Sequence, residues 1–423
     1  MPRERALIEA LATRYVADPN IERDALDQAY AQAMQEVHRQ YPDDLDIAVL
    51  YAEALMDTMP WNYWDEDGNP DPKTERLLST LESVMARDPK NIGALHLYIH
   101  AVEKEHPALA EAAADTLGPL VPGSGHLVHM PSHIYIRIGR YRDAVVANQQ
   151  AIAADNGYQR ETQVAPNIYT LAYMPHNYHF EWFAALMGGQ SELALDAADH
   201  TAQVDETMLQ DPDFAGALQH YYSVPLFTLI RFERWDDILA TPAPDEGLKY
   251  PVGIWHYAQG MALAAQEKTA QAREHLTMLQ TLVDDPSLTE QKIWGLNATN
   301  DIIHIATSVL AGEIAQAEGD SEQAIALLQQ AVDLEKQLVY NEPPDWYSPT
   351  QNLLGQVLLK SGHYDAAETA FLSDLDAYPQ NGWSLYGLAE SLEAQGKTSA
   401  AATIRKQYEA AWKYADTSLE MST

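Results

Sequence analysis

Residues 348–379 read SPTQNLLGQVLLKSGHYDAAETAFLSDLDAYP, and this stretch decides the fold. Apolar residues recur at helical spacing on both sides of Gly362, a residue type that favours a tight turn. Small residues at Gly355 and Ala367 would let two helices approach closely, and Pro379 would end the second one. The stretch therefore predicts a pair of antiparallel helices.

The same pattern recurs along the chain. Further pairs are marked by Gly387, Gly396 and Ala401, by Gly312, Gly319 and Ala324, by Gly260 and Ala272, and in weaker form by Gly139, Ala144, Gly189 and Ala194. Paired helices with a period of ~34 residues resemble the tetratricopeptide repeat. This resemblance implies an all-α fold, a right-handed α-solenoid of about eight to ten helix pairs.

We expect one continuous superhelix over residues 1–423, because each helix pair can bury its apolar face only against its neighbours. Within it we distinguish degenerate pairs in 1–90, His-rich pairs in 91–235 and regular repeats in 250–423.

Composition excludes several classes of partner. The formal charge of -36 disfavours nucleic acid and anionic membranes, and no apolar stretch suggests membrane insertion. The sequence has no cysteine and no visible signal peptide, which favours the cytoplasm, or the periplasm if a leader is missing. No Gly-rich phosphate loop, GxSxG or HExxH motif is present, so neither a bound nucleotide nor serine nucleophile chemistry is expected.

Histidines at helical spacing are the most distinctive feature. His96 and His100 are separated by four residues, Glu103 extends the same face, and His126, His129 and His133 share another. In tetratricopeptide repeats the first helix of each pair lines the concave face. Phasing on the predicted turns places on that face a candidate metal-binding set of His96, His100, Glu103, His126, His129, His133, His176 and His179.

Imidazoles three or four residues apart hold Zn, Cu, Fe or Ni efficiently, and a carboxylate gives a mixed set typical of catalytic sites. Glu103 would act as ligand or general base. Seven imidazoles exceed one tetrahedral ion, so two ions, or one ion with substrate-contacting histidines, are both open. A buried polar network and a metal-free ligand groove remain alternatives. Four tyrosines and one histidine would lie at the periphery, namely Tyr98, Tyr135, Tyr173, Tyr178 and His220.

Two prolines fall next to these histidines. Pro131 and Pro175 would each either begin a helix or kink one.

Three segments carry a more specific resemblance. Residues 96–103 read HLYIHAVE, residues 126–135 read HLVHMPSHIY and residues 174–182 read MPHNYHFEW. These segments are similar to a widespread bacterial family of tetratricopeptide-repeat proteins. The resemblance implies the fold and the His-rich segment, and it implies no reaction. Such proteins often carry a further helical pair before the position of Glu4, so we expect this chain to start late in the pattern.

Two functions follow as hypotheses. The first is a metal-binding repeat protein and, if it is an enzyme, one that activates water or dioxygen. The second is an adaptor that binds a peptide or partner protein in its groove.

Overall fold

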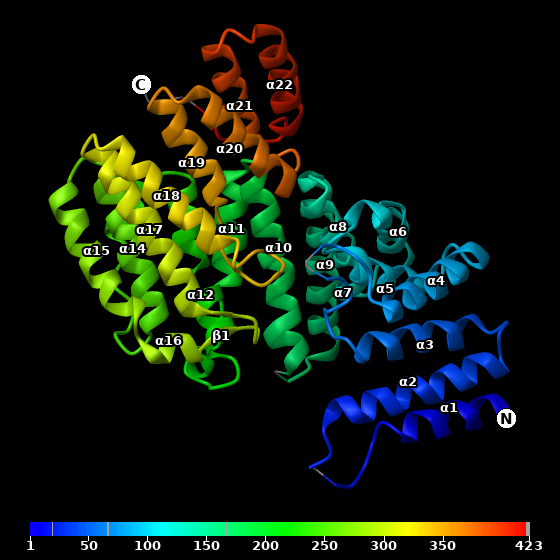
Figure 1. Cartoon of the computed structure of the whole chain (residues 1–423). Helices are drawn as coiled ribbons and strands as arrows, with labels where there is room; N and C mark the ends of the chain where they lie inside the picture. Colours follow the sequence, from blue (N-terminus) through cyan, green and yellow to red (C-terminus); the bar gives the residue numbers. More distant parts are fainter. Residues whose placement is uncertain (19, 66, 166, 420–423) are drawn as a thin grey trace. The chain divides into compact units, whose positions relative to one another are not determined.

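The computed structural model describes residues 1–18, 20–65, 67–165 and 167–419, and these residues are mostly helical. Figure 1 shows the helices in chain order. The chain divides into two compact units, Met1–Tyr135 and Ile136–Thr423. The prediction of one continuous superhelix over 1–423 stays a prediction.

The first unit is built from short and medium helices, which pack consecutively. They are α1 (Pro2–Ala12), α2 (Arg23–Gln40), α3 (Leu45–Asp57), α4 (Pro72–Arg87), α5 (Ile92–Val102), α6 (Glu111–Leu117) and α7 (Gly125–His129), with 3-10 turns η1 (Pro107–Ala110) and η2 (Gly118–Leu120). Helix α8 (Pro131–Arg137) carries the boundary between the units.

The second unit contains the regular helix pairs. Its helices are α9 (Tyr141–Thr162), α10 (Met174–Met187), α11 (Ser191–Thr201), α12 (Ala215–Arg231), α13 (Trp235–Ala240), α14 (Lys249–Ala265), α15 (Thr269–Val283), α16 (Pro286–Glu290), α17 (Thr299–Ala317), α18 (Ser321–Glu335), α19 (Thr350–Lys360), α20 (Tyr364–Ala377), α21 (Gly382–Ala394) and α22 (Thr398–Ala411). Short elements between them are η3 (Tyr169–Tyr173), η4 (Glu206–Met208), and the antiparallel strands β1 (Lys292–Ile293) and β2 (Asn297–Ala298).

The pair predicted from residues 348–379 is confirmed as α19 and α20. Gly362 joins the two helices with φ +80°, a left-handed conformation that glycine adopts without strain. Helix α20 ends at Ala377, ahead of Pro379. A Cβ atom added to Gly355 would lie 2.7 Å from Cε1 of the buried Phe371, so the close approach of the helices requires the missing side chain. The predicted all-α fold of tetratricopeptide-like helix pairs is confirmed.

The two prolines beside the histidines both lie in the first turn of an α-helix. Helix α7 ends at His129 and α8 starts at Pro131. Pro175 lies in the first turn of α10. At the start of α8 a missing backbone N–H costs little, because the first turn of a helix has no partner for it. Pro175 instead follows the π-helical residues Tyr169–Tyr173, which continue directly into α10.

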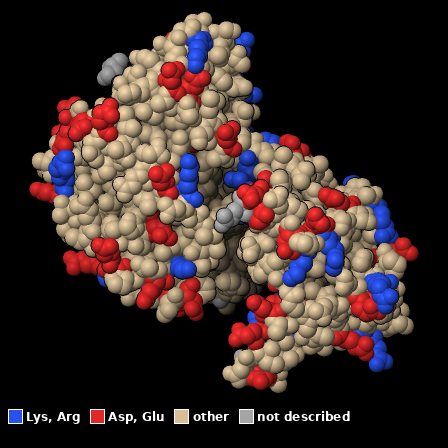
Figure 2. Space-filling model, in the orientation of Figure 1, with Lys and Arg blue, Asp and Glu red and all other residues tan. Residues whose placement is uncertain are grey.

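Charged groups are spread over the surface. Figure 2 shows acidic side chains dispersed over the visible face, with lysines and arginines between them. Among the described residues, no helix is both long enough and apolar enough to cross a bilayer.

Candidate metal centre

Helix α5 presents two of the predicted histidines. Asn91 caps its N-terminus, where the Asn91 side chain accepts a hydrogen bond from the Ala94 amide at 3.0 Å. The helix buries its apolar face in the first unit, which leaves His96 and His100 one turn apart and partly buried. Glu103 follows the last helical residue and is 1% exposed.

Helices α7 and α8 supply the other predicted histidine ligands of the first unit. His126 is partly buried on α7, whereas His129 at the end of α7 and His133 on α8 are buried. The break at Met130 separates the two helices, and the chain continues with Pro131. Five of the seven predicted histidine ligands therefore lie within one compact unit.

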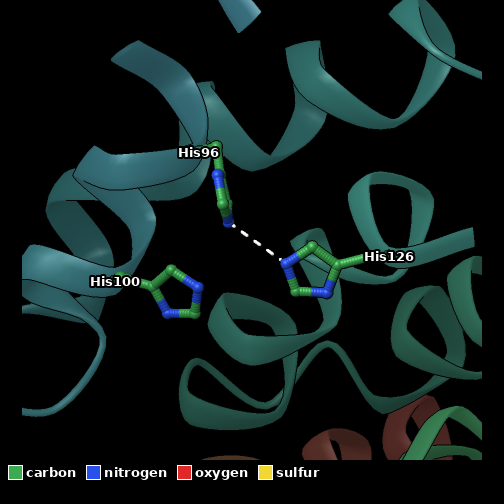
Figure 3. Close-up of side chains that lie close together, drawn as sticks. All are labelled: His96, His100 and His126. Carbon is green, nitrogen blue, oxygen red and sulfur yellow. Dashed lines mark hydrogen bonds between the residues drawn. The ribbon is translucent and has the colours of Figure 1, made fainter. Parts of the chain in front are cut away.

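Three of these rings converge. Figure 3 shows His96, His100 and His126 pointing toward one another. The Nε2 atoms of His96 and His126 lie 3.3 Å apart, and each of the three residues offers one ring nitrogen within 4.8 Å of the other two. Two nitrogens bound to one tetrahedral ion at ~2.0–2.1 Å would lie about 3.3–3.4 Å apart. The spacing of the His96–His126 pair is therefore that of two ligands on one ion.

The same three imidazoles are held neutral. Burial lowers the pKa of His96 to about 3, with a smaller contribution from the neighbouring imidazoles. Burial likewise lowers the pKa of His100 to about 4 and that of His126 to about 4. Since a metal binds the neutral ring, these side chains need no deprotonation at pH 7 to act as ligands.

A second pair follows directly. The Nε2 atoms of His129 and His133 lie 3.0 Å apart. The Ser132 hydroxyl donates to the His129 carbonyl at 2.6 Å and lies 3.2 Å from Nδ1 of the same residue. Because the hydroxyl has one hydrogen, it accepts from Nδ1–H, and the lone pair of His129 is then on Nε2.

Glu103 links the two groups. Its Oε2 lies 3.3 Å from Nδ1 of His100 and 3.4 Å from Nδ1 of His133. A carboxylate beside Nδ1 favours a hydrogen on that nitrogen and a lone pair on Nε2. The Nε2 lone pairs of His129 and His133 would then face each other at 3.0 Å, an arrangement that a cation stabilises.

The second unit holds the remaining predicted ligands, His176 and His179, both on α10. His176 packs on Phe180, with ring centroids 4.8 Å apart. His179 is buried, stacks on Trp182 at 5.1 Å and meets His220 edge-on at 5.8 Å. That these two histidines share one wall with those of the first unit stays a prediction.

His220, predicted to be peripheral, is fully embedded in the second unit. Its Nδ1 lies 2.9 Å from the hydroxyl of Tyr250, and burial lowers its pKa to about 3. This is the arrangement of a histidine satisfied inside a core, which was the alternative to a ligand role.

Each of the four predicted tyrosines has a contact outside the candidate metal-binding set. The Tyr98 hydroxyl donates to Glu82 at 3.1 Å and that of Tyr135 to Asp115 at 2.8 Å. In the second unit, Tyr173 stacks on Tyr169 at 5.7 Å and Tyr178 on His200 at 4.8 Å.

Sequence reasoning missed two neighbours of the histidines. Ser132 orients His129, and its position three residues further along the chain is a signal that could have found it. Trp61 lies edge-on to His100, with ring centroids 5.4 Å apart. No local spacing connects Trp61 to α5, so that contact arises only from the packing of the unit.

Comparison with known proteins finds a repeat in the second unit. A model of the tetratricopeptide repeat matches residues 304–380. Solved structures that resemble the chain include the crystal structure of the APC/C hetero-tetramer Cut9-Hcn1, with 11% identity, a TM-score of 0.37, and coverage of 98% of this chain and 79% of that one. Another is the structure of Naa15/Naa10 bound to HypK-THB, with 12% identity, a TM-score of 0.27, and coverage of 98% and 76%. None of the curated proteins compared with the chain matches it.

Proposed function

We propose that this tetratricopeptide-repeat protein binds a transition-metal ion in its first unit, through the imidazoles of His96, His100 and His126. The observation that carries the proposal is the convergence of three ring nitrogens within 4.8 Å, with one pair at 3.3 Å. Zn, Cu, Fe and Ni all accept neutral imidazole ligands, so each is a candidate.

Three protein ligands leave a coordination position for water or substrate. Sites of this kind lower the pKa of bound water or polarise a bound oxygen, whereas closed four-ligand sites are structural. Glu103 contacts Nδ1 of His100, so in this proposal it orients a ligand from behind rather than binding the ion itself. The His129–His133 pair, on the other side of Glu103, is the candidate for a second ion, and its 3.0 Å spacing suits ligands at about 90° on one ion.

Metal analysis of untagged protein, purified without a nickel column, tests the proposal. We expect one or two ions per chain by mass spectrometry, with about one ion lost in His126→Gln. The matched control is His363→Gln, because His363 is a surface histidine with 48% of its side chain exposed. A metal content near zero that stays there after incubation with Zn²⁺, Cu²⁺, Fe²⁺ or Ni²⁺ would overturn it.

The repeats support a second candidate function, that of an adaptor for peptides or proteins. Residues 304–380 match the tetratricopeptide repeat, a scaffold that commonly binds peptides or proteins along its first helices. As an adaptor the protein would bind such a partner in its groove without metal. Screening a displayed peptide library against the full chain, with and without chelator, separates the two. Peptide binding that is unchanged by the chelator supports the adaptor, and the absence of any selected peptide counts against it.

A further inference from the structure

The second unit contains a cavity that neither proposal uses. Its volume is about 440 Å³, within the range of pockets that take small molecules. Helices α12, α14, α17, α19 and α21, most of them the first helices of successive pairs, contribute to its lining. Its lining includes two basic residues, one amide and three aromatic rings, namely Arg231, Lys360, Gln356, Trp235, Tyr347 and Trp383.

Arg231, the last residue of α12, is 7% exposed. Its Nη1 donates to Ser348 Oγ at 2.9 Å and more weakly to Asn352 Oδ1 at 3.4 Å. Its Nε and Nη2 are buried and make no hydrogen bond within the described part of the chain. The face of the guanidinium lies over Trp383, 4.0 Å from the ring centroid. The protein thus provides acceptors for Nη1, whereas Nε and Nη2 have none.

The charge of Arg231 has no close counter-ion. Burial lowers its pKa to about 10, which leaves the guanidinium charged at pH 7. No carboxylate of the described residues forms an ion pair with it within 4.0 Å. The nearby Asp374 directs its Oδ2 to Asn381 and Ser384 instead. A buried charge without a counter-ion is costly, and a bound anion would offset that cost.

We propose that Arg231 binds the carboxylate of a small organic acid in this cavity. The Nε–H and Nη2–H groups point along one edge of the guanidinium and match the two oxygens of a carboxylate. Since Trp383 covers one face, the acid approaches in the plane of that edge. The rings of Tyr347 and Trp235 provide apolar surface for the body of the ligand.

The neighbouring charges favour a singly charged acid over a phosphate. Glu233 and Glu313 also line the cavity. Both would repel a dianion more strongly than a monoanion. Lys360 also lines the cavity and adds a second positive charge, but a single lysine does not neutralise both glutamates.

Three small probes test the proposal on the full chain, by calorimetry and ligand-observed NMR. They are benzoate, phenyl phosphate and the neutral benzyl alcohol. We expect benzoate to bind at least ~10-fold more tightly than benzyl alcohol, because only the carboxylate can accept two charge-assisted hydrogen bonds from Arg231. Phenyl phosphate should bind more weakly than benzoate. Equal binding of benzoate and benzyl alcohol, no saturable benzoate binding, or tighter binding of phenyl phosphate each overturns the proposal.

Variants locate the site. Arg231→Lys keeps the charge but removes the planar edge, so we expect a loss of ~10-fold or more in benzoate affinity. The matched control is Arg273→Lys, since Arg273 is an exposed arginine paired with Glu318 in the same unit. Gln356→Trp fills the cavity from a partly exposed position, should abolish binding, and decides the matter if Arg231→Lys does not fold. Unchanged benzoate affinity in folded Gln356→Trp overturns the proposal.

Discussion

At the scale of single residues, a neutral imidazole can bind a metal only through the ring nitrogen that carries no hydrogen. A neutral histidine has one acceptor nitrogen, and which one it is depends on the group beside the other. Ser132 assigns it for His129 and Glu103 for His133 and His100. The spacing of histidines predicts a shared helix face, but it does not predict which nitrogen faces the shared space.

Glu103→Gln tests that role directly. Both Nδ1 atoms lie beside the same carboxylate oxygen, and the amide replaces its negative charge by a neutral oxygen, so the hydrogens on the two Nδ1 atoms are held less strongly. We expect metal affinity to fall by ~10–100-fold while the full metal content is restored at excess metal. Competition with a coloured chelator measures the affinity.

Glu82→Gln is the control for this change. Glu82 accepts from the Tyr98 hydroxyl in the same unit and forms no hydrogen bond or ion pair with a histidine in the described part of the chain, so affinity should not change. If instead Glu103→Gln changes the coordination number of Co²⁺-substituted protein, Glu103 is a direct ligand and the orienting role is wrong.

A second prediction at this scale concerns Glu335 on α18. Burial raises its pKa to about 7, although its Oε2 accepts from the Thr350 amide at 2.8 Å. The folded protein therefore holds this proton at a pH where the unfolded chain has released it. The free energy of unfolding should fall as pH rises from about 4.5 to 7, by on the order of 3 kcal/mol from this group.

Glu335→Gln should remove that part of the pH dependence. Urea unfolding at pH 5 and pH 8, followed by circular dichroism, measures it in both proteins. Glu322→Gln on the same helix is the control, because the Glu322 side chain is 86% exposed. Parallel pH profiles of the wild type and Glu335→Gln would contradict the prediction.

At the scale of elements, the regular helix pairs were predictable because their turns carry glycine. Gly362, Gly319 and Gly396 all take positive φ where the chain reverses. Glu233 and Glu267 take the same left-handed conformation without being glycine, at φ 55° and 60°, so their turns left a weaker signal. In those hairpins the packing of the helices imposes the turn on a residue that does not prefer it.

Gly387 offers a test of close helix packing. A Cβ atom added there would lie 2.2 Å from Cζ of Phe371, the ring that also fills the space left by Gly355. Because Phe371 is buried, it cannot move into solvent. We expect Gly387→Ala to destabilise the protein by about 1–3 kcal/mol, measured as a lower urea midpoint.

The control for Gly387→Ala is Gly157→Ala on α9, whose new methyl group would meet only Arg160, at 3.9 Å. That change should leave the midpoint unchanged or raise it, because alanine favours a helix by up to ~1 kcal/mol. Restoration of stability by Phe371→Leu in the Gly387→Ala background would identify the clash. Equal midpoints for Gly387→Ala and wild type would contradict it.

At the scale of the whole molecule, the sequence predicted the composition of the candidate site better than its extent. His96 and His100 converge with His126 inside the first unit, whereas helical spacing alone places His96 and His100 on one face and His126 on another helix. His176 and His179 lie in the second unit, where His179 packs against His220. Phasing on turns assigns each helix a face, but it carries no information on how distant pairs are placed, because that depends on every intervening contact.

The charge of the chain gives a prediction at the same scale. With 62 acidic and 26 basic side chains, the folded protein concentrates negative charge that the expanded chain would separate. Raising NaCl from 10 mM to 300 mM shortens the screening length from about 30 Å to less than 8 Å. We expect stabilisation by about 1–2 kcal/mol, seen as a rise of about 1–2 °C in Tm.

Screening can be told apart from ion-specific effects by its concentration dependence. Most of the rise in Tm should occur below about 0.2 M, because the screening length changes most steeply there. KCl should give the same rise as NaCl at equal ionic strength, while sucrose, which is uncharged and stabilises by exclusion from the surface, should give no early steep phase. A Tm that is flat or falls below 0.2 M would mean that the local ion pairs, such as Arg273–Glu318, outweigh the net repulsion, since salt weakens both.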